Sequence, residues 1–181
     1  MRAVAVSRWV VGLALANGAL VGLADQASAD EHEWHVGAAF GASQLSFARA
    51  PSRWGMRGEA LARYGLSDAV DLTMELGVDG YPTDDRLALS SEVGVGYVVD
   101  VSRFIPAIGV ALGAVDVIDP RCDWHPTTCG HTVLPAIAVP ASFEFRVADV
   151  APVGVRFEYR LLFLGAPSSQ LFVGLYGGFI P

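Results

Sequence analysis

The sequence predicts an all-β protein: an eight-stranded antiparallel up-and-down transmembrane β-barrel preceded by a cleaved signal peptide. Three observations support this fold class. Beyond residue 33, apolar residues recur with a period of two and are interrupted by Gly, Pro, Asp and Ser. Apolar residues make up 52% of the chain, yet past the N-terminal segment no charge-free run has the composition of a spanning helix. The N-terminal segment itself is organised like an export signal.

The first element is this signal. Arg2 and Arg8 provide a positive start, residues 9–23 are almost uninterruptedly apolar, and residues 27–29 (Ala-Ser-Ala) offer small side chains for cleavage. A membrane anchor is the competing interpretation, but the apolar stretch is short and ends in Asp-Gln rather than in a basic flank. We therefore expect residues 1–29 to be a signal peptide and residues 30–181 to form one outer-membrane barrel domain.

The clearest strand is the segment 70–78. Val70, Leu72, Met74, Leu76 and Val78 alternate with Asp71, Thr73, Glu75 and Gly77, so one face is apolar and the other is charged or small. The same test predicts eight strands in all, and an even count suits an antiparallel barrel with both ends on one side. The predicted strands are Trp34 to Ser46, Arg57 to Leu66, Val70 to Asp79, Arg86 to Val99, Phe104 to Val117, Thr132 to Val147, Val153 to Leu164 and Gln170 to Ile180.

Connections between these strands alternate in length, as periplasmic turns and outer loops do in such barrels. The tight ones are Gly65 to Ala69, Asp100 to Arg103 and Ala148 to Pro152. The longer ones are Asp79 to Asp85 and Ile118 to Gly130. Two further outer connections, Ala48 to Met56 and Gly165 to Ser169, are of middling or short length, so the asymmetry is suggestive.

Charge excludes one class of partner. The chain has 19 acidic and 12 basic residues and a net charge of −7. Nucleic acid requires clustered positive charge for its phosphates, so we expect no nucleic-acid partner.

Charged residues concentrate on the face of the strands opposite to the apolar one. If the apolar face contacts lipid, six basic and seven acidic residues point into the lumen. They are Arg57, Glu59, Arg63, Asp71, Glu75, Asp79, Arg86, Glu92, Glu144, Arg146, Arg156, Glu158 and Arg160. Such a mixture can pair internally, and an eight-stranded barrel is just wide enough to be filled by its own side chains, so we expect a plugged lumen. The alternative is that these charges serve acid–base catalysis or line a narrow ion path. However, strand residues of the same parity face one lumen in any barrel, so the fold alone accounts for the cluster.

The cysteines lie close together in the longest predicted outer loop. Cys122 and Cys129 should form a disulfide in an oxidising compartment. The alternative is a zinc site in which His125 and His131 join the two thiolates, but the spacing does not match a standard zinc pattern.

Three segments carry a resemblance to a known family. They are LARYGLSDAVDLTMELGVDGY, GVGYVVDVSRFIPAIGVALG and the aromatic-rich last strand QLFVGLYGGFI. Over residues 34–181 the chain resembles the small eight-stranded outer-membrane barrels of the OmpA and OmpX type. Tyr64, Tyr97, Phe104, Phe145 and Phe179 would then form the aromatic ring at the periplasmic rim. Members usually end in an aromatic residue that the insertion machinery reads, whereas here Ile-Pro follows the last Phe.

The function expected from this resemblance is non-enzymatic: a Gram-negative outer-membrane barrel that supports the envelope or presents its outer loops. The partners expected are outer-membrane lipid, the barrel insertion machinery and an unidentified extracellular partner of the loops. We expect no catalytic residue and no cofactor. Three alternatives stay open: a lipid-active outer-membrane enzyme, a narrow channel, and a soluble periplasmic lipocalin-like barrel with the facing of every strand reversed.

Overall fold

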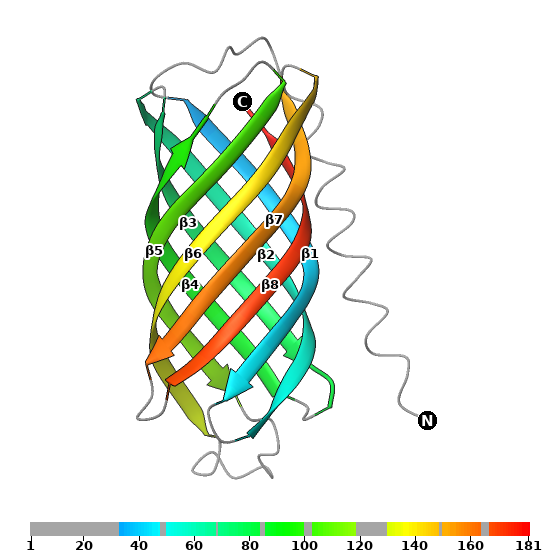
Figure 1. The fold of residues 1–181 in the computed structure, drawn as a ribbon, viewed down its shortest axis with the longest axis vertical. Coiled ribbons are helices and arrows are strands. Elements are labelled where there is room, and N and C mark those ends of the chain that lie inside the picture. Colours follow the sequence, from blue (N-terminus) through cyan, green and yellow to red (C-terminus); the bar gives the residue numbers. More distant parts are fainter. Residues whose placement is uncertain are drawn as a thin grey trace.

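The computed structural model describes residues 33–47, 50–67, 69–83, 86–99, 103–118, 130–148, 150–163 and 167–181. These residues form a closed antiparallel barrel of eight strands in chain order, in which β8 pairs with β1 (Figure 1). The predicted eight-stranded antiparallel up-and-down barrel is therefore confirmed. The strands are β1 (Trp34–Phe47), β2 (Ala50–Ser67), β3 (Val70–Tyr81), β4 (Arg86–Val98), β5 (Phe104–Ile118), β6 (His131–Ala148), β7 (Ala151–Phe163) and β8 (Pro167–Phe179). The described residues include no helix long and apolar enough to cross a membrane.

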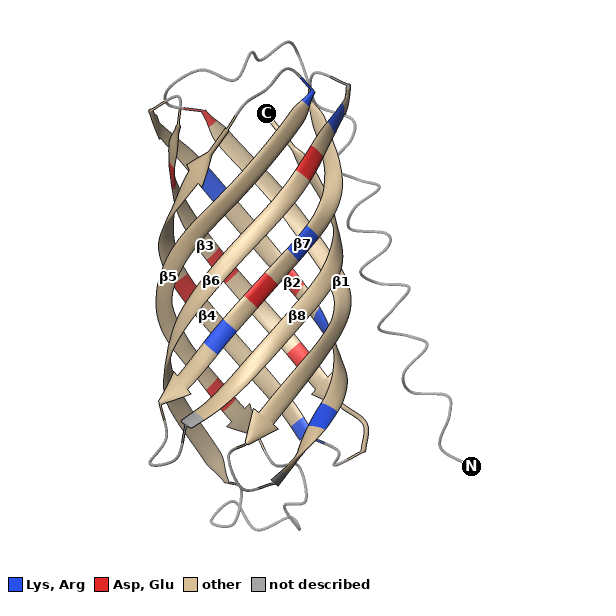
Figure 2. Cartoon of the chain, viewed as in Figure 1, with Lys and Arg blue, Asp and Glu red and all other residues tan. Residues whose placement is uncertain are grey.

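Most large apolar residues of the strands point outward, and nearly all of the charged residues point inward. Leu76 and Leu175 are 63% and 73% exposed, whereas Arg57 and Arg160 are fully buried. Charged residues lie along the middle of several strands (Figure 2), and their burial places them inside the barrel. Among the described strand residues, Asp116 near one end of β5 is the one charged carboxylate of outward parity. This facing is opposite to that of a soluble lipocalin-like barrel.

The barrel has two distinct ends. We call the end that holds Trp34 and Phe179 the terminal end, and the end at which β5 finishes and β6 begins the loop end (Figure 1). At the terminal end, the rings of Trp34 and Tyr64 lie 5.0 Å apart, and those of Phe104 and Phe145 lie 5.2 Å apart. Tyr97 is exposed at the same end, so the aromatic residues expected at one rim do lie there together.

Two predicted boundaries at the loop end are wrong. Strand β2 begins at Ala50 rather than Arg57, so most of the expected connection 48–56 is strand paired with β1. Proline and glycine favour turns by propensity, but the register of β1 and β2 shifts beside Pro51, and such an irregularity accommodates proline within a sheet. At Gly55 an added Cβ would lie 2.4 Å from the Gly80 carbonyl oxygen, so close approach explains this glycine. Strand β8 likewise begins at Pro167, not Gln170.

Several sequence predictions concern residues outside the described ranges. They include the signal peptide at 1–29, the disulfide between Cys122 and Cys129, and the zinc alternative, of whose four ligands the structure describes His131. These stay predictions.

Candidate functional site

The charged residues of the lumen form a site because side chains on a strand alternate between its two faces. Residues spaced by two, such as Arg57 and Glu59 on β2 or Arg156, Glu158 and Arg160 on β7, must therefore share the interior. The antiparallel neighbours of β2 add Glu75 and Asp79 from β3. The barrel brings these groups together from distant parts of the sequence.

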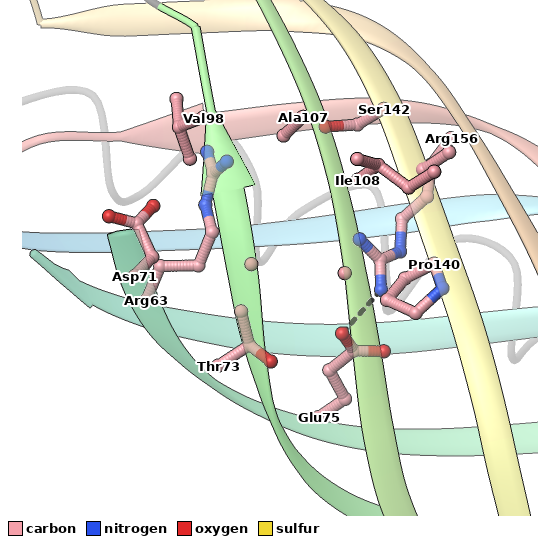
Figure 3. Close-up of a pocket in the computed structure, with 13 residues that line it drawn as sticks. Arg63, Asp71, Thr73, Glu75, Val98, Ala107, Ile108, Pro140, Ser142 and Arg156 are labelled. Atoms are coloured by element: carbon pink, nitrogen blue, oxygen red, sulfur yellow. Dashed lines mark ion pairs between the residues drawn. The ribbon is translucent and has the colours of Figure 1, made fainter. Parts of the chain in front are cut away.

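The group nearest the terminal end is centred on Arg63. Its Nη2 contacts the Glu144 carboxylate at 2.6 Å, and its guanidinium lies 5.8 Å from the centre of the Tyr176 ring. The Ser142 hydroxyl donates to Glu144 at 2.8 Å. Asp71 is also buried here, close to Arg63 (Figure 3). This group joins β2, β3, β6 and β8 across the lumen.

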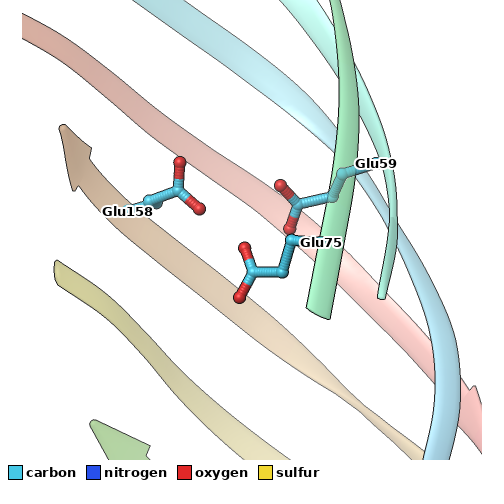
Figure 4. A group of neighbouring side chains, drawn as sticks. All are labelled: Glu59, Glu75 and Glu158. Carbon is cyan, nitrogen blue, oxygen red and sulfur yellow. The ribbon is translucent and has the colours of Figure 1, made fainter. Parts of the chain in front are cut away.

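The middle of the lumen holds Arg156 and three carboxylates. Arg156 Nε lies 2.5 Å from Glu59 Oε1, and its Nη2 lies 2.5 Å from Glu75 Oε1 and 3.6 Å from Glu158 Oε2. The three carboxylates face one another (Figure 4), and one oxygen of each lies within 4.8 Å of the others. One arginine therefore holds together three acidic groups from three strands.

Arg57 binds two of these carboxylates, Glu59 and Glu158, together with Asp79. Its Nε lies 2.8 Å from Glu59 Oε2, its Nη1 lies 3.1 Å from Asp79 Oδ2, and its Nη2 lies 3.6 Å from Glu158 Oε1. The guanidinium also stands 5.4 Å from the centre of the Phe172 ring, within reach of a cation–π interaction. Arg57 is fully buried and each of its nitrogens lies within ion-pair distance of a carboxylate.

Arg160 extends the network toward the loop end. It pairs with Glu92 and with Glu158 and donates to the Gln170 side-chain carbonyl. Gln170 in turn donates from Nε2 to the Tyr81 hydroxyl at 2.7 Å. The network thus runs without interruption from Asp79 and Glu75 on β3 to β8.

The charge of this network is unequal. Three arginines (57, 156 and 160) contact five carboxylates (59, 75, 79, 92 and 158), which gives 3 − 5 = −2 when all are ionised. Glu59, Glu75 and Glu158 are carboxylates of a kind that can ligate a cation, but arginine already pairs with each of them. Ion pairing therefore accounts for the cluster, and each arginine must compensate more than one buried acid.

Other residues expected at sites lie at the ends of the lumen. Arg86 and Arg146 have inward parity but are half-buried, Arg86 at the loop end and Arg146 at the terminal end. His131 Nδ1 lies 3.0 Å from Asp116 Oδ2 at the loop end. His131 is largely exposed there, and it directly follows the connection 119–130 that carries the cysteines.

A layer of apolar side chains crosses the lumen at the loop end, and the sequence analysis missed it. It is centred on Leu45, Val115, Leu134 and Leu162, with Tyr81, Ala88 and Ala136 packed among them. The signal was present in the alternation, because these residues share the inward parity of the charged ones. The predicted lumen residues were chosen by charge alone, so the inward-facing leucines were not among them.

No protein-family model matches the chain, and no curated protein has a matching sequence. Solved structures do match. Neisserial surface protein A aligns with a TM-score of 0.65 at 14% identity over 79% of this chain and 95% of that chain. The N-terminal barrel of OprF from Pseudomonas aeruginosa gives 0.55 at 12% identity over 82% and 98%. Ail, the attachment invasion locus protein of Yersinia pestis, gives 0.51 at 12% identity over 82% and 99%. The chain therefore has the fold of small eight-stranded outer-membrane β-barrels.

Proposed function

We propose that this chain is a non-enzymatic outer-membrane protein of a Gram-negative bacterium, whose barrel spans the membrane with a lumen closed to solutes. The observation that carries the proposal is the facing of the strands. Large apolar side chains cover the outside, including Met74 and Leu76 on β3 and Val173 and Leu175 on β8, while ionised groups are held inside. Water would penalise such an exterior, whereas lipid hydrocarbon favours it.

Two kinds of side chain fill the lumen, and both support its closure. Paired charges occupy the middle, and the layer around Leu134 and Leu162 follows toward the loop end. An ion passing along the barrel would have to displace paired charges and then leave water to cross apolar side chains. We therefore assign the protein no diffusion pore.

The role that fits a closed barrel is envelope support or the display of outer loops. The connection 119–130 is the longest between strands, and it carries both cysteines. Loops on a rigid scaffold are common recognition elements, and the name of Ail associates that barrel with attachment and invasion. By analogy, an external partner would meet this chain at the loop end. Outer-membrane lipid and the insertion machinery complete its proposed partners.

Electrophoresis in SDS tests the membrane barrel. The protein is extracted from the outer-membrane fraction with detergent, and unheated samples are compared with boiled ones. A closed barrel resists cold SDS, so we expect a compact species that shifts in mobility on boiling. An unchanged mobility together with recovery in the soluble periplasmic fraction would contradict the proposal.

Planar-bilayer recording tests the closed lumen. We expect no discrete conductance steps from the wild type, and steps from Leu134→Ser/Leu162→Ser, which makes the apolar layer polar and smaller. Steps from the wild type would refute closure. Lipid A that co-purifies with the protein is expected to keep its acyl pattern, and a pattern altered by the wild type would refute a non-enzymatic role.

A further inference from the structure

A cavity lies in the half of the lumen nearer the terminal end, between Arg63 and the Arg156–Glu75 pair (Figure 3). Its polar lining consists of Arg63, Asp71, Thr73, Glu75, Ser142 and Arg156. The space accessible inside it suits about one water molecule.

Small residues on β4, β5 and β6 leave this space open. Gly96, Gly109 and Pro140 line the opposite wall, where long side chains would otherwise fill the lumen. A Cβ added at Gly96 would lie 3.7 Å from Thr73 Cγ2, an ordinary contact, so the position tolerates a methyl group that would project into the space. The β5–β6 ladder also skips Gly109 and Pro140 between the pairs Ile108–Ala141 and Ala111–Ala138, and proline has no N–H to contribute.

Arg156 Nε and Nη2 lack hydrogen bonds but pair with carboxylates. Three further polar atoms of the cavity wall have neither a hydrogen bond nor an ion pair with the residues that the structure describes. They are Arg63 Nε, Thr73 Oγ1 and Glu75 Oε2. The three residues are only 6%, 7% and 3% exposed, so all are more than nine-tenths buried. Buried polar groups almost always find a partner in protein or in ordered water. Three such atoms on one small cavity therefore point to a ligand shared by all three.

The wall also specifies the kind of ligand. Its ionised groups are Arg63 and Arg156 against Asp71 and Glu75, so the formal charge is 2 − 2 = 0. Because the opposite charges of the wall balance, neither an anion nor a cation gains a net attraction to the cavity. Arg63 Nε can only donate, Glu75 Oε2 when ionised can only accept, and the Thr73 hydroxyl can do either. A neutral ligand that both donates and accepts satisfies the set.

We propose that this cavity is a binding site for ordered water, in which a water molecule accepts from Arg63 Nε, donates to Glu75 Oε2 and hydrogen-bonds the Thr73 hydroxyl. Bound water joins the Arg63 group to the Arg156 network, which completes one polar chain along the lumen up to the apolar layer. The site deepens the closed-lumen proposal. The two fail separately, because water binding is read by NMR and closure by conductance.

NMR of the folded protein in lipid nanodiscs tests the site through nuclear Overhauser transfer from long-lived water. We expect cross-peaks from water to the Thr73 methyl and the Gly96 amide. In Gly96→Ala the added methyl occupies the space, so the Thr73 cross-peak should be lost. Gly177→Ala is the matched control, since an added Cβ there has nothing within 4 Å, and it should keep the cross-peak. A wild type without these cross-peaks, or a Gly96→Ala variant that retains the one at Thr73, would overturn the proposal.

The effect of Thr73→Val on folding stability is an independent test of the water site, because the direction of the change differs with and without bound water. If water binds the Thr73 hydroxyl, Thr73→Val removes a satisfied hydrogen bond and should lower the folding equilibrium constant about fivefold. If the hydroxyl has no hydrogen-bond partner, the same substitution removes an unsatisfied buried polar group, and the folding equilibrium constant should rise. A rise would contradict the water site.

Discussion

Removing Arg156 should destabilise the barrel far more than neutralising one of its acidic partners. Arg156→Met keeps a long side chain but leaves two arginines to compensate five carboxylates, which changes the network from −2 to 2 − 5 = −3. Breaking a buried ion pair from one side typically costs about 3–5 kcal/mol. Glu75→Gln instead reduces the negative excess, and Arg156 retains Glu59 and Glu158. We expect that variant to cost about 1 kcal/mol or less.

Urea unfolding of the barrel in lipid vesicles measures both free energies. The double variant Arg156→Met/Glu75→Gln should recover about 1–3 kcal/mol relative to Arg156→Met, because it removes the carboxylate that the first change leaves uncompensated. Arg103→Met, at an exposed turn, is the control and should cost about 1 kcal/mol or less. If Arg156→Met prevents folding, the fraction that stays compact in cold SDS ranks the variants. Equal losses for Arg156→Met and Glu75→Gln would refute the charge argument.

Three further predictions concern the wall and the outer loop. Gly41→Ala should cost about 1–3 kcal/mol in the same unfolding assay, since the new Cβ would lie 2.0 Å from the Val173 carbonyl oxygen. Gly177→Ala is the control and should be close to neutral, because an added Cβ there has nothing within 4 Å. Equal losses of stability for the two variants would argue against the tight β1–β8 contact. Leu175→Arg should cost about 2–4 kcal/mol in vesicles if this 73% exposed side chain faces lipid, and a change within about 0.5 kcal/mol would indicate water there. Intact-mass analysis of unreduced protein should show the loss of two hydrogens for the Cys122–Cys129 disulfide, while stoichiometric zinc retained through chelator-free purification would favour the alternative.

The strands were predictable because apolar and polar residues alternate along them with a period of two, which shows the side of the sheet that each residue faces. Segment 70–78 shows this best: apolar residues at even positions are exposed or half-buried, and Asp71 and Glu75 are buried. The start of β2 was not predictable in the same way. Pro51 and Gly55 are turn residues by propensity, and only pairing with β1 and the nearby Gly80 carbonyl makes them part of a strand.

The sequence predicted which charged residues enter the lumen, but not which of them pair with one another. Parity placed Arg57 and Glu158 on the inner face, yet the ion pair between them depends on barrel closure, which no local pattern encodes. The inward leucines at the loop end were overlooked because apolar residues were assigned to lipid as a class. The cavity beside Thr73 could not be inferred either, since it arises where small residues from β4, β5 and β6 meet.

Spin-label accessibility along β8 tests the central claim most directly. Single cysteines are introduced at positions 171 to 175 in a Cys122→Ser/Cys129→Ser background, labelled, and reconstituted in lipid vesicles. Labels at Leu171, Val173 and Leu175 should collide with dissolved oxygen and be shielded from a water-soluble nickel complex, because these residues face outward and are 40%, 40% and 73% exposed. Labels at the alternate positions should show little oxygen access. Preferential collision of the outward labels with nickel would place them in water and contradict a membrane-spanning barrel.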